Sequence, residues 1–328
     1  MKHSAATIGR MALDDYVDAV PHIYGAHDAY RSIWDVWCHT LHHGAAVAER
    51  IRKGAPPEKL FVEIADLAVW LFTTVQRLYG RPGKRKTPSE TPVETLIRTR
   101  SKCSDALWHR YPGVCHLCYA RRTRKHSVAE IFAPCDCQSQ EPDHRDKETK
   151  RADQKALRDF SNRMRKKKPR SIDDWQTMFG TIFARNIEVL STVEIGFHLL
   201  EELGEASDAM IRMYSYSKGN FVRREPNWRQ ARLEDQIADV FSWLFSLVEK
   251  LNAAERFVQE GQTGSKSSNQ RESGHITLSG IVWSRYGRDR NGGFRCPCCD
   301  SAVCSCQLIF VPGTHSVKEL LGKFEKQK

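Results

Sequence analysis

Carboxylates at helical spacing stand out in two separate stretches of the chain. Glu205 lies three residues after Glu202 and four after Glu201, so on one helix their side chains share a stripe. Asp239 lies within the otherwise apolar run 237–241, where an unpaired carboxylate would be costly, and we expect it to have a cationic partner. Acids on one stripe repel each other, and Mg²⁺ relieves that repulsion while it binds phosphate oxygens. The pattern indicates a magnesium site, with a solvated acidic helix face as the alternative.

Two helices must position these acids so that they face each other. The first acidic helix has apolar residues at helical spacing, which predicts one buried face. These apolar positions are Phe183, Ile187, Leu190, Phe197, Leu200 and Leu203.

The second acidic helix has an earlier copy in the chain. Eight residues of the segment 64–78 recur identically in 237–251, at the constant offset that separates Asp66 from Asp239. The first acidic helix has a weaker copy, in which Leu41-His42-His43 stands where Leu200-Glu201-Glu202 stands and Tyr24-Gly25 resembles Phe179-Gly180. We expect two tandem helical units that pack about a pseudo-twofold axis through the helices of Trp70 and Trp243, as an internal pseudo-dimer.

A cysteine module follows each helical unit. Trp-x-Arg-Tyr at 108–111 and again at 283–286 leads into a CxxC pair and then a CxC pair. Paired thiolates on two turns suit a closed tetrahedral zinc site, which is structural rather than catalytic. The expected zinc ligands are Cys115, Cys118, Cys135 and Cys137 in the first module and Cys296, Cys299, Cys304 and Cys306 in the second.

The acidic motifs resemble those of the MazG-type nucleotide pyrophosphohydrolases, the all-α NTP pyrophosphatases. That family has Glu-Glu-x-x-Glu on one helix and Glu-x-x-Asp on the next, and the resemblance covers residues 176–254. It implies a hydrolase that splits a nucleoside triphosphate between the α and β phosphates, with Mg²⁺ as cofactor and Glu201 as candidate general base. The residues implied for magnesium are Glu202, Glu205, Gln236 and Asp239, and those suggested for the substrate phosphates are Lys218, Arg223, Arg224, Arg229 and Arg232.

The chain departs from this pattern in both units. Gln236 occupies the place of the family's second-helix Glu and removes one negative charge. Asp235, which is Val62 in the first unit, is a candidate relocated ligand or a plain surface residue. The first unit keeps Glu63 and Asp66 on its second helix.

The first helix of that unit has lost its acids, because His42, His43 and Ala46 replace them. Histidine prefers softer metals than Mg²⁺, and we interpret the first unit as degenerate. Glu63 and Asp66 serve the structure there, or complete a site across the pseudo-dimer.

Together these patterns predict a mainly α fold in six segments. They are helical unit 1 (12–80), zinc module 1 (95–140), a basic linker (145–170), helical unit 2 (171–256), a flexible linker (261–274) and zinc module 2 (275–328).

Charge and composition suggest the partners. The segment 145–170 holds 12 Lys/Arg and 4 Asp/Glu, so it carries +8 of the net +11. We interpret it as a solvated linker or polar helix, with contact to a nucleic acid or another anionic partner as the alternative. No run of 18 apolar residues and no signal peptide occur, so we expect a soluble cytoplasmic protein without a membrane partner, with further homo-oligomers left open. A non-catalytic nucleotide- or nucleic-acid-binding zinc scaffold and a purely structural zinc-stabilised helical protein are the competing hypotheses.

Overall fold

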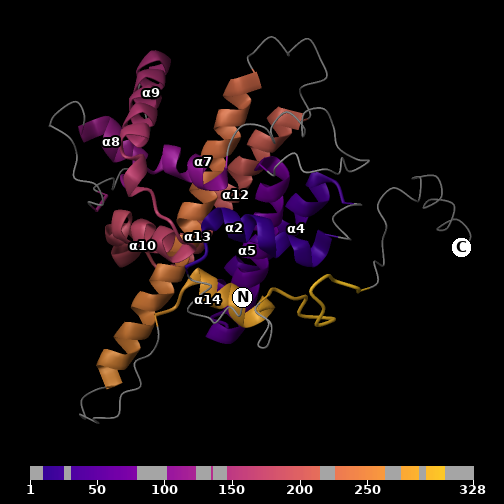
Figure 1. Cartoon of the computed structure of the whole chain (residues 1–328). Coiled ribbons are helices and arrows are strands. Elements are labelled where there is room, and N and C mark those ends of the chain that lie inside the picture. Colours follow the sequence, from indigo (N-terminus) through magenta and orange to yellow (C-terminus); the bar gives the residue numbers. More distant parts are fainter. Residues whose placement is uncertain are drawn as a thin grey trace, which may run out of the picture.

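A computed structural model describes residues 10–25, 31–79, 102–122, 134–135, 146–214, 226–262, 275–287 and 293–306. Within these ranges the protein is helical, as the sequence predicted, and its β pairing is one isolated bridge between Gly287 and Phe294. Figure 1 shows helix α13 running along the molecule, with the other helices packed along its sides.

Residues 10–79 form the first helical unit. Its elements are α2 (Leu13–Ala19), η1 (Val20–Tyr24), α4 (Ile33–Arg52) and α5 (Pro57–Tyr79). A capping box starts α4, where Ser32 and Asp35 satisfy each other's backbone N–H groups. Gly54, with φ of +59°, lies in the short turn that returns the chain into α5.

Residues 171–262 repeat this order as the second helical unit. Its elements are α10 (Ile172–Ile182), α11 (Ala184–Val189), α12 (Thr192–Tyr214) and α13 (Pro226–Gln262). A capping box of Ser171 and Asp174 starts α10. Helix α13 continues past the predicted end of the unit at residue 256 and takes in 261 and 262; the rest of the predicted flexible linker, 263–274, lies outside the described residues.

Equivalent side chains in the two units make equivalent contacts. Trp70 on α5 stacks with Tyr24 and His39, at ring-centroid distances of 5.5 and 4.2 Å. Trp243 on α13 stacks with Phe183 and His198, at 6.4 and 4.5 Å. Tyr24 therefore corresponds to Phe183, and the expected match with Phe179 was one helical turn out of register.

The first acidic helix also begins later than its apolar spacing suggested. Ile187 belongs to α11, before a break that ends at Thr192. On α12 itself Leu203 is fully buried, whereas Phe197 is 57% exposed. The predicted apolar stripe is thus divided between two helices, and Phe197 does not belong to the core.

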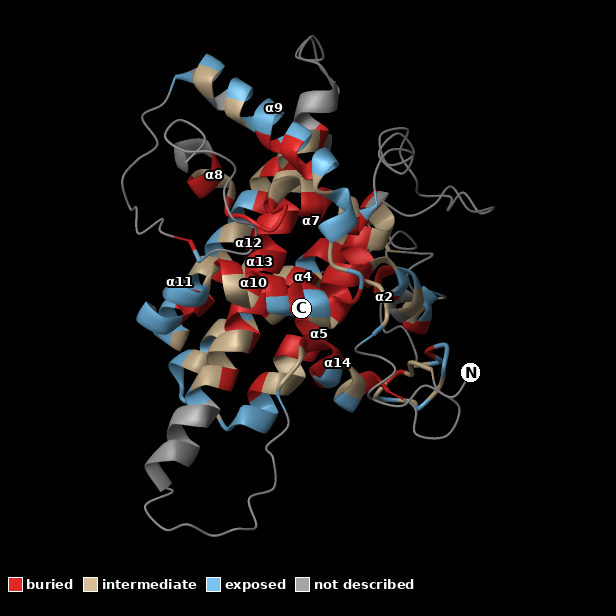
Figure 2. Cartoon of the chain, turned by 60° about the vertical axis from the view of Figure 1, so that its left-hand side comes forward, coloured by how far each residue is buried: buried red, intermediate tan, exposed pale blue. Residues whose placement is uncertain are grey.

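The two units meet mainly where α4 crosses α12. Gly44 lies against Leu203, and the indole N–H of Trp37 donates a 2.8 Å hydrogen bond to Ser207 Oγ across the same crossing. Phe72 of α5 and Phe241 of α13 add a ring contact at 6.0 Å. The buried residues concentrate where these four helices come together (Figure 2), so the two units share one hydrophobic core.

Two further helices connect the units. Helix α7 (Cys103–Arg110) follows the first unit and α14 (Leu278–Tyr286) follows the second. Ser104 Oγ on α7 donates to Asp14 at 2.5 Å, and Ser279 Oγ on α14 donates to Asp173 at 2.6 Å. The start of each helix is therefore attached to the first helix of the unit that precedes it.

The basic segment is an ordered part of the fold. It forms α9 (Lys147–Arg163) and η2 (Arg165–Lys167), while α8 (His116–Arg122) lies beside α9. Leu157 and Phe160 are buried against Val114 and Tyr119, which form a second, smaller hydrophobic cluster. Its outer face exposes basic residues, so only that face matches the prediction of a solvated linker.

Among the described residues, no helix is both long enough and apolar enough to cross a membrane.

We predict that the α4–α12 crossing depends on the missing side chain at Gly44. A Cβ there would overlap Leu203 Cδ1, so Gly44→Leu should destabilise the protein by about 2–3 kcal/mol through overpacking. Gly204→Leu is the matched control, because a Cβ at Gly204 meets nothing within 4 Å. Chemical denaturation of both variants measures the difference, and equal midpoints would contradict the crossing.

Candidate functional site

Asp239 is held by two side chains that arrive from α7. Arg110 Nε donates to Asp239 Oδ1 at 2.9 Å, and its terminal nitrogen donates to Oδ2 at 2.7 Å. The hydroxyl of Tyr111 donates to Oδ1 at 2.5 Å. Burial alone would lower the pKa of Arg110, but Asp239 and Asp235 raise it above its ordinary value. The predicted cationic partner of Asp239 is therefore Arg110.

Asp66 has the same arrangement in the first unit. Arg285 Nε and its terminal nitrogen donate to the two oxygens of Asp66 at 2.8 and 2.9 Å, and Tyr286 donates to Oδ1 at 2.5 Å. The hydrogen bonds that Arg285 donates to Asp66 raise the pKa of Arg285, and the negative charge of Asp66 adds to that effect. We call each such set an Arg-Tyr-Asp cluster.

Each Arg-Tyr-Asp cluster joins the end of one connecting helix to the other unit. Helix α7, which follows unit 1, binds the Asp of unit 2, and α14, which follows unit 2, binds the Asp of unit 1. The cysteine segments follow the same rule. The backbone N–H of Cys135 donates to Ile182 O in unit 2, and that of Cys304 donates to Ile23 O in unit 1.

The cysteines gather in two clusters. The sulfurs of Cys296, Cys299, Cys304 and Cys306 all lie within 4.8 Å of one another, and so do those of Cys115, Cys118 and Cys135. Cys137 lies outside the described residues.

The sulfur spacing of the second cluster suits a metal. Cys296 and Cys306 are 4.0 Å apart at Sγ, as are Cys299 and Cys304. Zn–S bonds of about 2.3 Å in a tetrahedron place sulfurs about 3.8 Å apart, whereas a disulfide requires about 2.0 Å. The backbone N–H of Ser305 donates to Cys299 Sγ, which lowers the pKa of that thiol to about 5 and favours the thiolate that zinc requires. Both clusters could hold a metal such as zinc.

A cavity of about 640 Å³ opens between α12, α13 and the first cysteine segment. Its size is within the range of small-molecule sites. Four residues that the sequence proposed for magnesium line it, together with others that it did not propose. The lining includes Glu202, Glu205, Gln236 and Asp239 from the prediction, and Arg110, Tyr111, His116, Arg185, Asn186, His198 and Trp243 in addition.

Two polar groups of this cavity are unfavourably placed: the Glu202 carboxylate lies near like charges, and the Gln236 side-chain oxygen has no hydrogen-bond partner among the described residues. Burial, together with the charges of Asp239 and Glu205, raises the pKa of Glu202 to about 8. The side-chain oxygen of Gln236 is buried without a hydrogen-bond partner among the described residues. A buried acceptor of this kind costs about 1–3 kcal/mol, which a bound cation or donor would offset.

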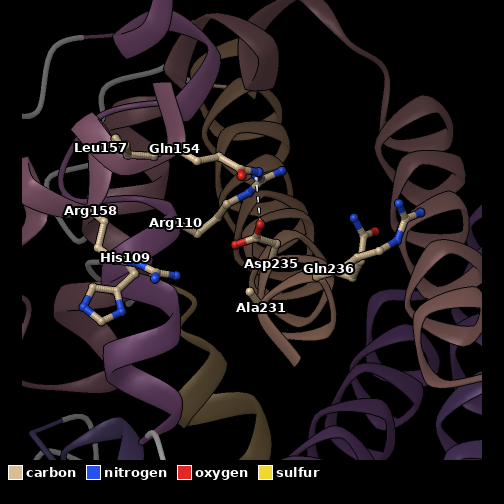
Figure 3. A pocket seen from close by; sticks show the side chains of 9 residues that line it. His109, Arg110, Gln154, Leu157, Arg158, Ala231, Asp235 and Gln236 are labelled. Atoms are coloured by element: carbon tan, nitrogen blue, oxygen red, sulfur yellow. Dashed lines mark ion pairs between the residues drawn. The ribbon is translucent and has the colours of Figure 1, made fainter. Parts of the chain in front are cut away.

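Glu201 and Asp235 lie away from this cavity. Glu201 is exposed, and its Oε2 lies 3.2 Å from Nδ1 of His198, within hydrogen-bond distance. Asp235 faces a smaller cavity of about 230 Å³ and lies 3.7 Å from Arg110 (Figure 3). Burial raises the pKa of Asp235 to about 6. In Figure 3 the side chains of Asp235 and Gln236 leave α13 in different directions, so Asp235 does not replace Gln236 at the larger cavity.

The basic residues suggested for phosphate binding are placed only in part. Lys218, Arg223 and Arg224 lie outside the described residues, and the side chain of Arg229 is not described. Arg232 lines the smaller cavity and lies 3.5 Å from Asp208.

Arg110 and Tyr111 are site residues that were not predicted from the sequence. The repeat could have revealed them, because an Arg-Tyr pair recurs before each cysteine module and an Asp recurs in each second helix. Arg185 and Asn186, which also line the cavity, have no repeated signal of this kind.

No protein family, curated protein or solved structure matches this chain in comparisons with known proteins.

We predict that Arg110→Ala destabilises the protein by about 3–5 kcal/mol, because it leaves Asp239 buried and unpaired. Arg285→Ala is the matched variant at the other cluster. Its loss should be smaller, because Arg285 is 30% exposed at its side chain against 16% for Arg110. Adding Asp239→Asn to Arg110→Ala should recover part of the loss in thermal denaturation. Additive losses in the double variant would argue against the ion pair.

We expect two zinc ions per chain, one for each cysteine cluster. Cys115→Ser and Cys296→Ser should each remove one ion and unfold the segment around it, since zinc binding and local folding are coupled. Cys38→Ser is the control, because Cys38 is exposed and belongs to neither cluster. Metal analysis of the purified variants measures this, and fewer than about one zinc per cluster in the unmodified chain would contradict it.

Proposed function

We propose that the protein is a Mg²⁺-dependent nucleoside triphosphate pyrophosphohydrolase whose site is the cavity of unit 2. The observation that carries the proposal is the meeting of Glu202, Glu205 and Asp239 with the unpartnered oxygen of Gln236 in one cavity of ligand size. The like charges that raise the pKa of Glu202 would be relieved by a divalent cation. The resemblance of the acidic motifs to the MazG-type enzymes supplies the reaction.

Glu202 and Glu205 are the residues that would hold the metal. Mg²⁺ in nucleotide enzymes needs only one or two carboxylates in addition to substrate phosphates and water. When bound, it neutralises the polyphosphate and activates a water for attack. Asp239 contributes less to the metal than the sequence-based expectation, because Arg110 and Tyr111 bind both of its oxygens and leave one lone pair, on Oδ2. It also fixes Arg110 at the cavity wall.

The base and the phosphate contacts also differ from the sequence-based proposal. Glu201 is exposed and paired with His198, so it is a weak candidate for the general base. The carboxylates that line the cavity, Glu202, Glu205 and Asp239, are engaged by the metal or by Arg110, so none of them is assigned as the base in its place. Arg185 and Arg110 line the cavity and are the cations placed to meet a phosphate.

The architecture fits an internal pseudo-dimer of two MazG-like units. Support comes from the paired Arg-Tyr-Asp clusters and from the crossing of α4 with α12 near Gly44 and Leu203, which are equivalent positions of the two units. In a twofold arrangement equivalent residues meet at the axis. We therefore place the axis at this crossing rather than through the helices of Trp70 and Trp243.

The alternative is a non-catalytic scaffold that binds nucleotides or nucleic acid. The specific observation in its favour is that the Asp of each unit is bound by a guanidinium, which supplies the positive charge a metal would otherwise supply. Zinc at both cysteine clusters and the exposed basic face of α9 would then do the binding.

We predict Mg²⁺-dependent release of pyrophosphate from at least one nucleoside triphosphate, measured across a nucleotide panel. Glu202→Gln and Glu205→Gln should each lower the rate on the order of a hundredfold or more, because each removes charge stabilisation in the cavity. Gln236→Glu should raise the rate, whereas Asp235→Asn and Glu63→Gln should change it little.

Glu201→Gln serves as the matched control for Glu202→Gln, since the two residues are neighbours and only Glu202 lines the cavity. Equal losses in both would contradict this assignment. If no nucleotide is turned over and Gln236→Glu restores nothing, the scaffold is the better description.

A further inference from the structure

A second group of potential metal ligands lies in unit 1, at the positions equivalent to the cavity of unit 2. His43 on α4 and Glu63 and Asp66 on α5 each offer one ligand atom, and these three atoms lie within 4.8 Å of one another. His43 Nδ1 and Glu63 Oε2 are 3.2 Å apart and share a hydrogen bond, a spacing that two ligands of one ion also have. The three side chains are 16%, 14% and 9% exposed, so water competes weakly for them.

The remaining contacts of these residues resemble the support that metal ligands usually have. Arg50 donates to Glu63 Oε1 at 3.2 Å and leaves Oε2 facing His43. Arg285 and Tyr286 fix the carboxylate of Asp66. Ligating carboxylates are commonly oriented by such hydrogen bonds from a surrounding shell. Asp66 Oδ1 accepts from both Arg285 and Tyr286, so Oδ2, which accepts once from Arg285, is the oxygen with a lone pair left for an ion.

We propose that unit 1 binds one divalent transition-metal ion through His43, Glu63 and Asp66. One imidazole with two carboxylates suits Zn²⁺, Co²⁺ or Mn²⁺ better than Mg²⁺, which prefers oxygen alone. Three protein ligands also leave a coordination position open to water, unlike the four-cysteine cluster of Cys296, Cys299, Cys304 and Cys306. Unit 1 has His43 and Glu63 at the positions where unit 2 has Glu202 and Gln236, and this difference changes the metal that each unit selects. This site does not depend on the activity proposed for unit 2.

The test is Co²⁺ titration of the full chain with its cysteine clusters loaded with zinc. We expect one further Co²⁺ per chain by equilibrium dialysis, with the weak visible absorption of nitrogen and oxygen ligands. Intense sulfur-to-cobalt bands would instead assign the ion to the cysteines and overturn the proposal.

His43→Asn and Glu63→Gln should each weaken this binding by at least tenfold. His198→Asn is the matched control, because His198 and Glu201 form a His–Glu pair of the same 3.2 Å length on the surface, with no third ligand close by among the described residues. Two variants at the site guard against misfolding in either one, with circular dichroism to confirm helicity. Binding that survives in both, or that falls equally in His198→Asn, would overturn the proposal.

Discussion

The ion pair between a buried Asp and an Arg from the opposite half of the chain is the constraint on which the rest of this structure depends. Asp239 is buried among the apolar residues Ile237, Ala238, Val240 and Phe241, and a buried charge left alone there would be costly. Arg110 meets that need only if α7 crosses from unit 1 to unit 2. The first cysteine segment, which follows α7 directly, must then lie on unit 2, where the backbone N–H of Cys135 donates a hydrogen bond to Ile182 O. One electrostatic requirement therefore sets the position of a helix, a cysteine cluster and a cavity wall.

A buried pair of this kind is weak evidence for high stability, because desolvation of both ions offsets most of their attraction. Its stronger effect here is on geometry. The fork of Arg110 binds both oxygens of Asp239 and Tyr111 adds a third hydrogen bond, so the direction of the carboxylate is fixed. The same three bonds recur at Asp66. Repetition of the whole set at two places makes a coincidental contact a poor explanation.

The sequence predicted what depends on local spacing and on the repeat. Helical content, the cysteine groupings and the need of Asp239 for a cation all follow from residue types at short range. The structure has the helices, the ion pair and the cysteine clusters, apart from Cys137, which lies outside the described residues. The sequence did not show which unit each cysteine segment would join, because that is decided by long-range pairing. It also assigned Glu201 to the site, since a helical stripe does not show which of two adjacent acids faces inward. Burial decides that point: Glu202 lines the cavity and Glu201 is exposed.

The comparison of the two units separates residues kept for the fold from residues that determine chemistry. Asp66 and Asp239 are identical and bound identically, so a carboxylate at this position is required by the Arg-Tyr-Asp cluster whether or not a metal is present. The neighbouring positions differ: His43 and Glu63 in unit 1 stand where Glu202 and Gln236 stand in unit 2. A change of function after duplication is free to act on these positions, because they take no part in joining the units. The conserved pair of residues, Asp66 and Asp239, is therefore a poor indicator of catalysis. The differing positions beside them, His43 and Glu63 in unit 1 and Glu202 and Gln236 in unit 2, are better indicators.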